Sequence, residues 1–362
     1  MIHPIHEKWA ALLTEYCTTV TKGENVLLFV ETSALPMARA LTRKVLELGA
    51  YPILRMIYPE YEEDLYELAQ EHHFEGSPSF ELSEIKQIHS WIRIRGPENT
   101  KALQNADKKK IAAHMKWFRD VQNIRINETR WVGTLYPTNA LAQDADMSLS
   151  EYEHFVYSSM YLFDDDPVAK WQEVHNFQAK LIDRLKVADE VHLKGEGTDL
   201  KMRVKDRVWV NSDGHKNMPS GEVFTGPIED SVNGFITYQI PSSVRGIEVE
   251  NVQLTFEDGK VVAANADKGN DFLQAQLNTD NGARFLGELG IGTNYNIQQA
   301  TKQILYDEKI GGTIHLALGQ SYPETGGVNE SAIHWDMICD LRKGGAIYLD
   351  GELFQEKGQF KI

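Results

Sequence analysis

A chain of 362 residues with 42% hydrophobic and 25% charged residues has the composition of a folded protein, and its length is enough for two domains. Its formal net charge of −16 argues against nucleic acid as a main partner, because phosphate binding requires clustered Lys and Arg. The two cysteines, Cys17 and Cys339, are too few for a disulfide framework or a cysteine-based zinc site.

The N-terminal residues MIHPIHEKWAALLTEY lack the basic segment and following apolar segment of a signal peptide. No apolar run approaches the ~18 residues that a membrane-spanning helix requires. We therefore expect a cytoplasmic protein without a membrane partner.

The first half of the chain alternates between helix and strand patterns. In chain order, the patterns predict a helix over 3–20, a strand over 24–32, a helix over 35–48, a strand over 51–58, an acidic helix over 60–72, a strand over 91–96, a helix around 101–121, a strand over 130–137, and helices over 148–163 and 167–186. Strands separated by helices predict a parallel sheet that is covered on both faces.

The pattern changes near Val187, where short strands and glycine turns begin. The clearest hairpin signal is Asp258-Gly259, which lies between two β runs. We therefore predict two domains. Residues 1–187 form an α/β N-terminal domain with a mainly parallel sheet, and residues 188–362 form an α+β, β-rich metal-binding domain.

Four polar clusters lie among glycines and other small residues in the predicted second domain. They are NMPSGEVFTGPIEDSVNG (217–234), RFLGELGIGTN (284–294), GGTIHLALGQSYPETGG (311–327) and SAIHWDMICDLR (331–342). The candidate functional residues in them are, in chain order, Glu222, Glu288, His315, Tyr322, His334 and Asp336.

Two Glu, two His and one Asp form a nitrogen-and-oxygen ligand set that suits zinc, cobalt or manganese. One catalytic zinc normally takes three protein ligands, so five ligands suit two ions that share a bridging carboxylate. Residues two apart in a strand point to the same face, so His334 and Asp336 can project together while Trp335 faces the core. A strand from Thr313 to Leu318 would likewise project His315 from one face.

Each candidate also has a purely structural interpretation. A His in an apolar strand is more often a core or edge residue than a ligand, Glu222 could face solvent, and Glu288 could cap a turn. Four such clusters in one domain favour the metal site over these separate explanations. The chain contains no GxGxxG or GxxxxGK[ST] nucleotide motif, no HExxH and no GxSxG.

At these clusters the sequence resembles the M29 family of metallopeptidases, the thermophilic aminopeptidases of the aminopeptidase T, S and II type. The resemblance covers nearly the whole chain and is most specific in NMPSGEVFTGP, LGELGIGTN, GTIHLALGQSYP and SAIHWDM. It implies metal ligands at Glu222, Glu288, His315, His334 and Asp336 and an active-site tyrosine at Tyr322. It also implies a homodimer with enclosed sites, and hence short peptide substrates.

One segment departs from the resemblance. Only eleven residues, PETGGVNESAI, separate Tyr322 from His334, and this segment looks shorter than in typical members. A shorter loop would alter the rim of the site rather than the metal ligands, so it affects the expected substrate range more than the chemistry.

The expected activity is removal of N-terminal residues from short peptides by a metal-activated water at a two-metal site, with zinc as the first choice and cobalt or manganese as alternatives. One ion would also bind the free α-amine. We expect Tyr322 to donate a hydrogen bond to the oxyanion, and Glu222 or Glu288 to act as general base. The alternatives are a metal-dependent amidase or deacylase and a non-catalytic metal-binding protein, which the lack of Cys ligands disfavours.

Overall fold

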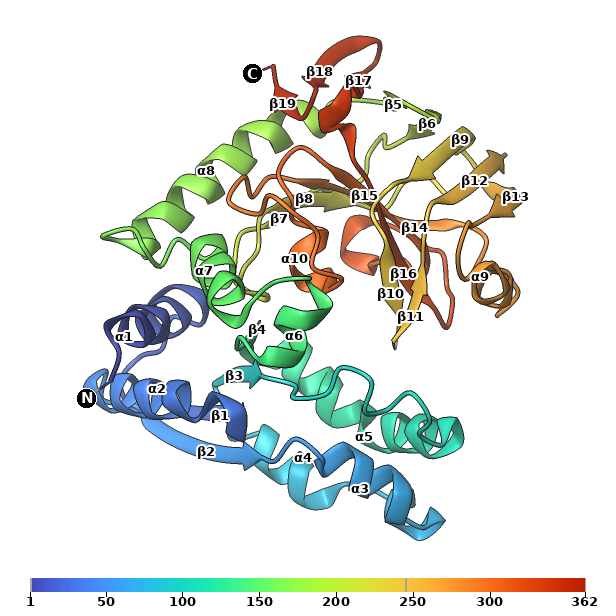
Figure 1. The fold of residues 1–362 in the computed structure, drawn as a ribbon. Helices are drawn as coiled ribbons and strands as arrows, with labels where there is room; N and C mark the ends of the chain where they lie inside the picture. The colour runs from blue at the N-terminus through green and yellow to red at the C-terminus, as the bar shows by residue number, and fades with distance from the viewer. Residues whose placement is uncertain (1, 245, 362) are drawn as a thin grey trace. The chain divides into compact units, whose positions relative to one another are not determined.

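The computed structural model describes residues 2–244 and 246–361. The chain divides into two compact units, of which the first contains Met1–Lys170 and Gly214–Pro219 and the second contains Trp171–Asp213 and Ser220–Ile362 (Figure 1). The domain boundary predicted between residues 187 and 188 stays a prediction. A bilayer-spanning helix is absent from the described residues, because none of their helices combines sufficient length with an apolar sequence.

The first unit is built on a four-stranded parallel sheet with the strand order β2-β1-β3-β4. Residues 26–28 at the centre of β1 are all buried, which is typical of a parallel strand covered on both faces. The predicted parallel sheet is thereby confirmed. Its strands are β1 (Asn25–Glu31), β2 (Tyr51–Ile57), β3 (Ser90–Arg95) and β4 (Arg130–Leu135).

Helices connect these strands, and one of them begins later than predicted. The helix expected from residue 101 begins at Lys108, because the Asp107 side chain caps it by accepting a hydrogen bond from the Lys109 backbone N–H at 2.8 Å. The α-helices up to residue 185 are α1 (Pro4–Ala11), α2 (Leu35–Glu47), α3 (Tyr61–Leu68), α4 (Ser79–Ile85), α5 (Lys108–Glu128), α6 (Asn139–Asp144), α7 (Leu149–Ser159) and α8 (Pro167–Leu185). The π-helix η1 (Leu12–Cys17) and the 3-10 helices η2 (Thr32–Ala34) and η3 (Glu71–Phe74) complete this part of the chain.

The second unit is β-rich, as predicted, and its largest sheet has eight antiparallel strands in the order β13-β12-β9-β6-β5-β17-β18-β19. Asp258 and Gly259 form the predicted two-residue turn between β12 and β13, with positive φ values of 46° and 82°. The strands are β5 (Glu190–Gly195), β6 (Thr198–Arg203), β9 (Asn233–Tyr238), β12 (Val252–Glu257), β13 (Lys260–Asn265), β17 (Ala346–Leu349), β18 (Glu352–Glu356) and β19 (Gln359–Phe360).

A second, five-stranded antiparallel sheet in this unit has the order β16-β15-β14-β8-β7. Alternate residues of its strands, including Leu289, Leu316 and Trp335, belong to the hydrophobic core of the unit. Its strands are β7 (Val210–Ser212), β8 (Glu222–Thr225), β14 (Leu286–Gly292), β15 (Ile314–Gly319) and β16 (His334–Cys339). The remaining elements are β10 (Ser242–Val244), β11 (Ile247–Val249), α9 (Asn270–Leu277), α10 (Ile304–Asp307), η4 (Pro323–Thr325) and η5 (Leu341–Lys343).

Candidate metal centre

The five candidate ligands come from four neighbouring strands of the five-stranded sheet. Glu222 begins β8, Glu288 lies in β14, His315 lies in β15, and His334 and Asp336 lie in β16. They alternate with core residues along their strands, so they project from the face opposite the hydrophobic core. The sheet therefore brings together five residues from four separate segments of the sequence.

Small residues make space for these side chains on the sheet. Gly290 pairs with His315, and a Cβ at residue 290 would lie only 2.0 Å from Cε1 of the imidazole. Ala317 pairs with Glu288 on one side and with Asp336 on the other, so it separates two carboxylates by one small side chain. The small residues of β14 and β15 are thus needed for the arrangement of the ligands.

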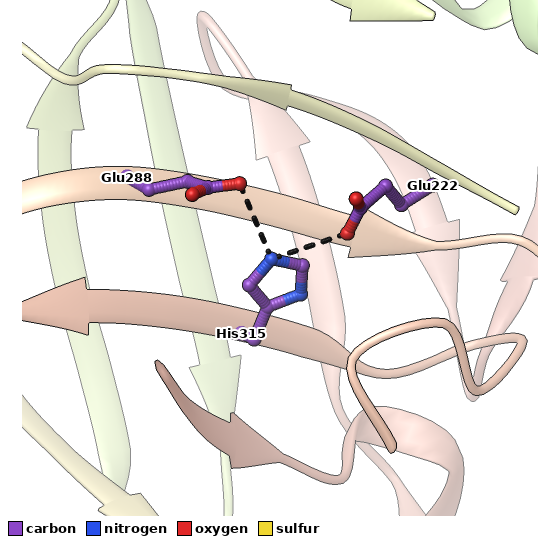
Figure 2. Close-up of side chains that lie close together, drawn as sticks. All are labelled: Glu222, Glu288 and His315. Carbon is purple, nitrogen blue, oxygen red and sulfur yellow. Dashed lines mark hydrogen bonds and ion pairs between the residues drawn. The ribbon is translucent and has the colours of Figure 1, made fainter. Parts of the chain in front are cut away.

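The ligands form two groups that share Glu288. In the first, Nε2 of His315 lies 3.3 Å from Oε2 of Glu222 and 3.4 Å from Oε1 of Glu288 (Figure 2). In the second, Nε2 of His334 lies 3.2 Å from Oε2 of Glu288 and 3.5 Å from Oδ2 of Asp336. The two carboxylate oxygens of Glu288 therefore face two different histidines, and each group has the size of a metal site.

The polar atoms of this cluster fit a divalent cation. Within the described residues, Oε2 of Glu222 and Oδ1 of Asp336 are buried without a hydrogen-bond partner, which is unfavourable for a carboxylate unless a cation satisfies it. The backbone carbonyl of Gln320 lies 2.8 Å from Nδ1 of His334, an arrangement that leaves Nε2 facing the carboxylates. Imidazole nitrogens and carboxylate oxygens together suit zinc, cobalt or manganese.

The electrostatics of the cluster also favour cations. Burial opposes a charge on His334, but Asp336 and Glu288 outweigh it and raise the pKa of this imidazole to about 11. Burial is likewise outweighed at His315, where Glu288 and Glu222 raise the pKa to about 9. Burial alone would raise the pKa of Glu288, yet the two histidines hold it below its usual range. The carboxylates therefore stabilise positive charge at both imidazoles.

Two further charged residues lie in the site, and the sequence analysis missed both. Nζ of Lys309 donates a hydrogen bond to Oε1 of Glu222 at 2.6 Å and another to Oε1 of Glu308, and the lysine side chain is only 1% exposed. A carboxylate oxygen of Glu308 lies within 4.8 Å of ligand atoms of His315 and Asp336. The charged run Asp307-Glu308-Lys309 in an apolar and glycine-rich segment could have indicated them. Charged side chains in such a segment are rarely buried unless they pair with other charges.

Tyr322 lies beside the second ligand group. Its ring centroid is 5.1 Å from that of His334 and 5.6 Å from that of Phe224, and the residue is 43% exposed. Burial removes water from the hydroxyl, and the nearby carboxylates, chiefly that of Glu288, repel the negative charge of a phenolate. Both effects raise the pKa of Tyr322 above its usual value. The phenol is therefore a neutral hydrogen-bond donor at the edge of the site.

A buried set of imidazole and carboxylate ligands with a neutral phenol beside it is typical of metal-dependent hydrolases. The family model described as thermophilic metalloprotease (M29) matches residues 3–360. The chain belongs to this family, so it is a metal-dependent enzyme that acts on peptide bonds.

Characterised relatives agree with this family. Aminopeptidase AmpS of Bacillus subtilis is 28% identical over 380 residues, which cover 91% of this chain and 91% of the relative. Aminopeptidase T of Thermus thermophilus is 26% identical over 391 residues, which cover 95% of each chain.

Two solved structures share the fold. Wild-type AmpT from Thermus thermophilus has a TM-score of 0.84 at 23% identity and covers 99% of each chain. A 2,5-dihydroxypyridine dioxygenase from Pseudomonas putida KT2440 has a TM-score of 0.58 at 12% identity, covering 99% of this chain and 96% of that one. Because proteins with such different names share one fold, the function has to be argued from the site.

Proposed function

We propose that the protein removes N-terminal residues from short peptides with two divalent ions, held by Glu222, Glu288, His315, His334 and Asp336. Its family and its relatives make it a metal-dependent aminopeptidase. The observation that carries the two-ion proposal is the position of Glu288, which belongs to both ligand groups and turns one carboxylate oxygen toward each histidine.

Each residue of the site has a role in this proposal. Glu222 and His315 complete one ligand group, His334 and Asp336 complete the other, and Glu288 bridges them. When bound, the ions lower the pKa of a water molecule toward neutrality and polarise the scissile carbonyl. The contact between Lys309 and Oε1 of Glu222 leaves Oε2 of that carboxylate as the oxygen available to an ion.

Tyr322 is proposed to donate a hydrogen bond to the oxyanion that develops on the scissile carbonyl. The proposal is supported by the position of its ring beside His334 and by the raised pKa, which keeps the hydroxyl protonated. A single donor of this kind contributes ~3 kcal/mol to transition-state stabilisation in well-studied enzymes.

The requirement for a free N-terminus separates this proposal from an amidase or deacylase. A charged α-amine suits a site that is lined by carboxylates, whereas an acetylated N-terminus carries no charge. The test incubates the metal-loaded protein with leucine p-nitroanilide, with an N-acetylated peptide and with acylated amides. We expect turnover only where the amine is free. Efficient cleavage of blocked substrates would support the amidase, and no turnover of any substrate would support a metal-binding protein.

The identity of the ions and the assembly of the protein are further parts of the proposal. Zinc is the first choice, and cobalt or manganese can occupy the same nitrogen and oxygen ligands. We propose a cytoplasmic homodimer. Light scattering coupled to size-exclusion chromatography tests the dimer, with a mass of twice 41.1 kDa as the expected result.

A further inference from the structure

The main chain of the ligand Glu222 is held by a residue from a distant helix. Nε2 of Gln178, in α8, donates a hydrogen bond to the backbone carbonyl of Glu222 at 2.9 Å, and Gln178 is fully buried. At the other end of the same glutamate, Nζ of Lys309 donates to Oε1 at 2.6 Å. With the carbonyl and Oε1 both held, Oε2 is directed toward Nε2 of His315, which lies 3.3 Å away. The position of this ligand oxygen therefore depends on Gln178 as well as on Lys309.

The amide of Gln178 joins three segments of the second unit. Nε2 also lies 3.2 Å from the carbonyl of Ser212, the last residue of β7, and 2.9 Å from the hydroxyl of Thr293, which follows β14. Ser212 and Glu222 are paired residues of β7 and β8. Because a carbonyl oxygen only accepts hydrogen bonds, the two carbonyls require the nitrogen of the amide, not its oxygen, at this position. Gln178 thus ties α8 to the end of the sheet where Glu222 begins β8.

The two residues before Glu222 are held in the same way. Nδ2 of Asn294 donates to the carbonyl of Ser220 at 3.0 Å, and the backbone N–H of Thr293 donates to the carbonyl of Gly221 at 2.8 Å. Gly221 has a φ of 117°, and a Cβ there would lie 2.6 Å from the Cβ of Asn294, so this position requires glycine. Three successive carbonyls are thus bound by groups of the protein. These contacts account for residues of two polar clusters of the sequence that supply no ligand.

The second ligand group lies away from this network. Its residues His334 and Asp336 are in β16, at the opposite edge of the five-stranded sheet from β7. Among the described residues, the hydrogen bonds of Gln178 reach the main chain of Glu222 and of no other ligand. A change at Gln178 should therefore act on the first ligand group more than on the second.

We propose that Gln178 is a positioning residue for the ion of the first ligand group, an inference that rests on the proposed two-ion function. Its amide fixes the main chain at the start of β8, so that Oε2 of Glu222 is in place before an ion binds. Residues that orient a metal ligand without touching the metal typically contribute roughly 10–100-fold to the affinity for the ion. The loss of the amide should therefore weaken the binding of one ion and spare the other.

The test is a zinc titration of the Gln178→Met variant in competition with a chelator of known affinity. Methionine keeps the length and most of the volume of glutamine but has no N–H donor. We expect the affinity for one zinc ion to fall by ~10-fold or more, and the affinity for the other to stay within about twofold of the wild type. The weakened step should be the one that His315→Ala removes, whereas His334→Ala should remove the other step.

Gln355→Met is the matched control. Gln355 lies in β18 of the same unit and is also fully buried, but neither polar atom of its amide has a hydrogen-bond partner among the described residues. The same substitution there should leave both zinc affinities unchanged. Thr293→Val is a second, milder variant, because it removes the hydroxyl that accepts from Gln178 and keeps the volume. It should weaken the binding of the same zinc ion by ~5-fold, and it decides the question if Gln178→Met does not fold.

Three results of the titration would contradict the inference. The first is equal weakening of both zinc ions, which would mean that Gln178 supports the fold in general. The second is wild-type affinity for both ions in a folded Gln178→Met, and the third is weakening of the ion that His334→Ala removes. A wild-type protein that binds a single zinc ion would overturn the two-ion proposal together with this inference. One that binds two zinc ions but cleaves no peptide with a free N-terminus would overturn only the proposed activity.

Discussion

The parallel sheet of the first unit and the five-stranded sheet of the second unit differ in the polar groups that they bury. In the parallel sheet, β1 lies between β2 and β3, and open α/β sheets commonly bind ligands beyond the carboxyl ends of strands at such a point. Here two hydrogen bonds join the carboxyl end of β1 to the segment that follows β3. The backbone N–H of Gly96 donates to Glu31 at 2.7 Å, and the hydroxyl of Ser33 donates to the carbonyl of Gly96 at 2.6 Å.

The five-stranded sheet instead buries a cluster of carboxylates and histidines. Its ligand face buries Glu288 and His315 at 4% and 1% exposure, and two carboxylate oxygens nearby, on Glu222 and Asp336, have no hydrogen-bond partner among the described residues. Buried polar atoms without a partner also occur in the parallel sheet, as at Nε of Arg93. The cluster of carboxylates and histidines therefore indicates the functional site, whereas the type of sheet does not.

The largest effect is expected from removing a ligand of the second unit. His315→Ala should lower kcat/KM by ~1,000-fold or more. The proposed ligands act as one catalytic unit, so the loss of one of them removes most of the effect of all of them. Hydrogen exchange should show that β1 of the first unit remains protected. His192→Ala is the control, since this histidine also lies in an antiparallel strand of the second unit but pairs with Asp199. Near-normal turnover by His315→Ala with a normal metal content would remove His315 from the ligands.

Tyr322→Phe should have the next largest effect. It removes one hydroxyl and little volume, so kcat and kcat/KM should fall together by ~100-fold while KM changes little. The metal content should stay at the wild-type value. A variant with wild-type kcat would show that the ring only packs against Phe224 and His334, and a variant that loses an ion would make the hydroxyl a ligand.

A glycine in each sheet gives a matched comparison of packing. Gly290→Ala places a methyl group 2.0 Å from the imidazole of His315, and displacing a ligand in this way should weaken metal binding by ~10-fold or more. The overpacking should also lower the free energy of unfolding by ~1–3 kcal/mol. Gly133→Ala in β4 is the control, because its nearest contact is Oδ1 of Asn217 at 3.7 Å. Metal titration and urea unfolding measure both effects, and equal results for the two variants would contradict the steric role of Gly290.

The smallest effect is expected at the carboxyl ends of β1 and β3 in the parallel sheet. Glu31→Gln keeps an oxygen that can accept from Gly96, so the free energy of unfolding should change by only about 1 kcal/mol. Turnover and metal content should equal those of the wild type. A large loss of activity would mean that the carboxyl end of the parallel sheet takes part in the function.

The sequence predicted those features that depend on a regular period or on one local signal. The alternation in β16 correctly placed Trp335 in the core, where it is 4% exposed, and projected His334 and Asp336 from the other face. The hairpin at Asp258-Gly259 followed from its turn residues. The five candidate ligands were selected from four polar clusters, and the resemblance pointed to the same residues, whereas the spacing of single residues does not select them.

Other features depend on contacts that no local pattern encodes. Glu308 and Lys309 follow a single helical turn, so neither a strand period nor a helix period predicts which way they point. Their burial is set by the packing of the segment between β14 and β15 onto the ligands. The start of α5 was also missed, because the Asp107 side chain caps the helix at Lys108 although residues 101–104 are good helix formers.

The central claim is that Glu288 bridges two ions, and the number of ions per chain tests it most directly. The measurement is elemental analysis of the wild type and of Glu288→Gln after loading with zinc and removal of unbound metal. The account predicts two ions per chain in the wild type and less than one in the variant, because both ligand groups lose their shared carboxylate. A single ion in the wild type, or two ions retained in Glu288→Gln, would contradict it.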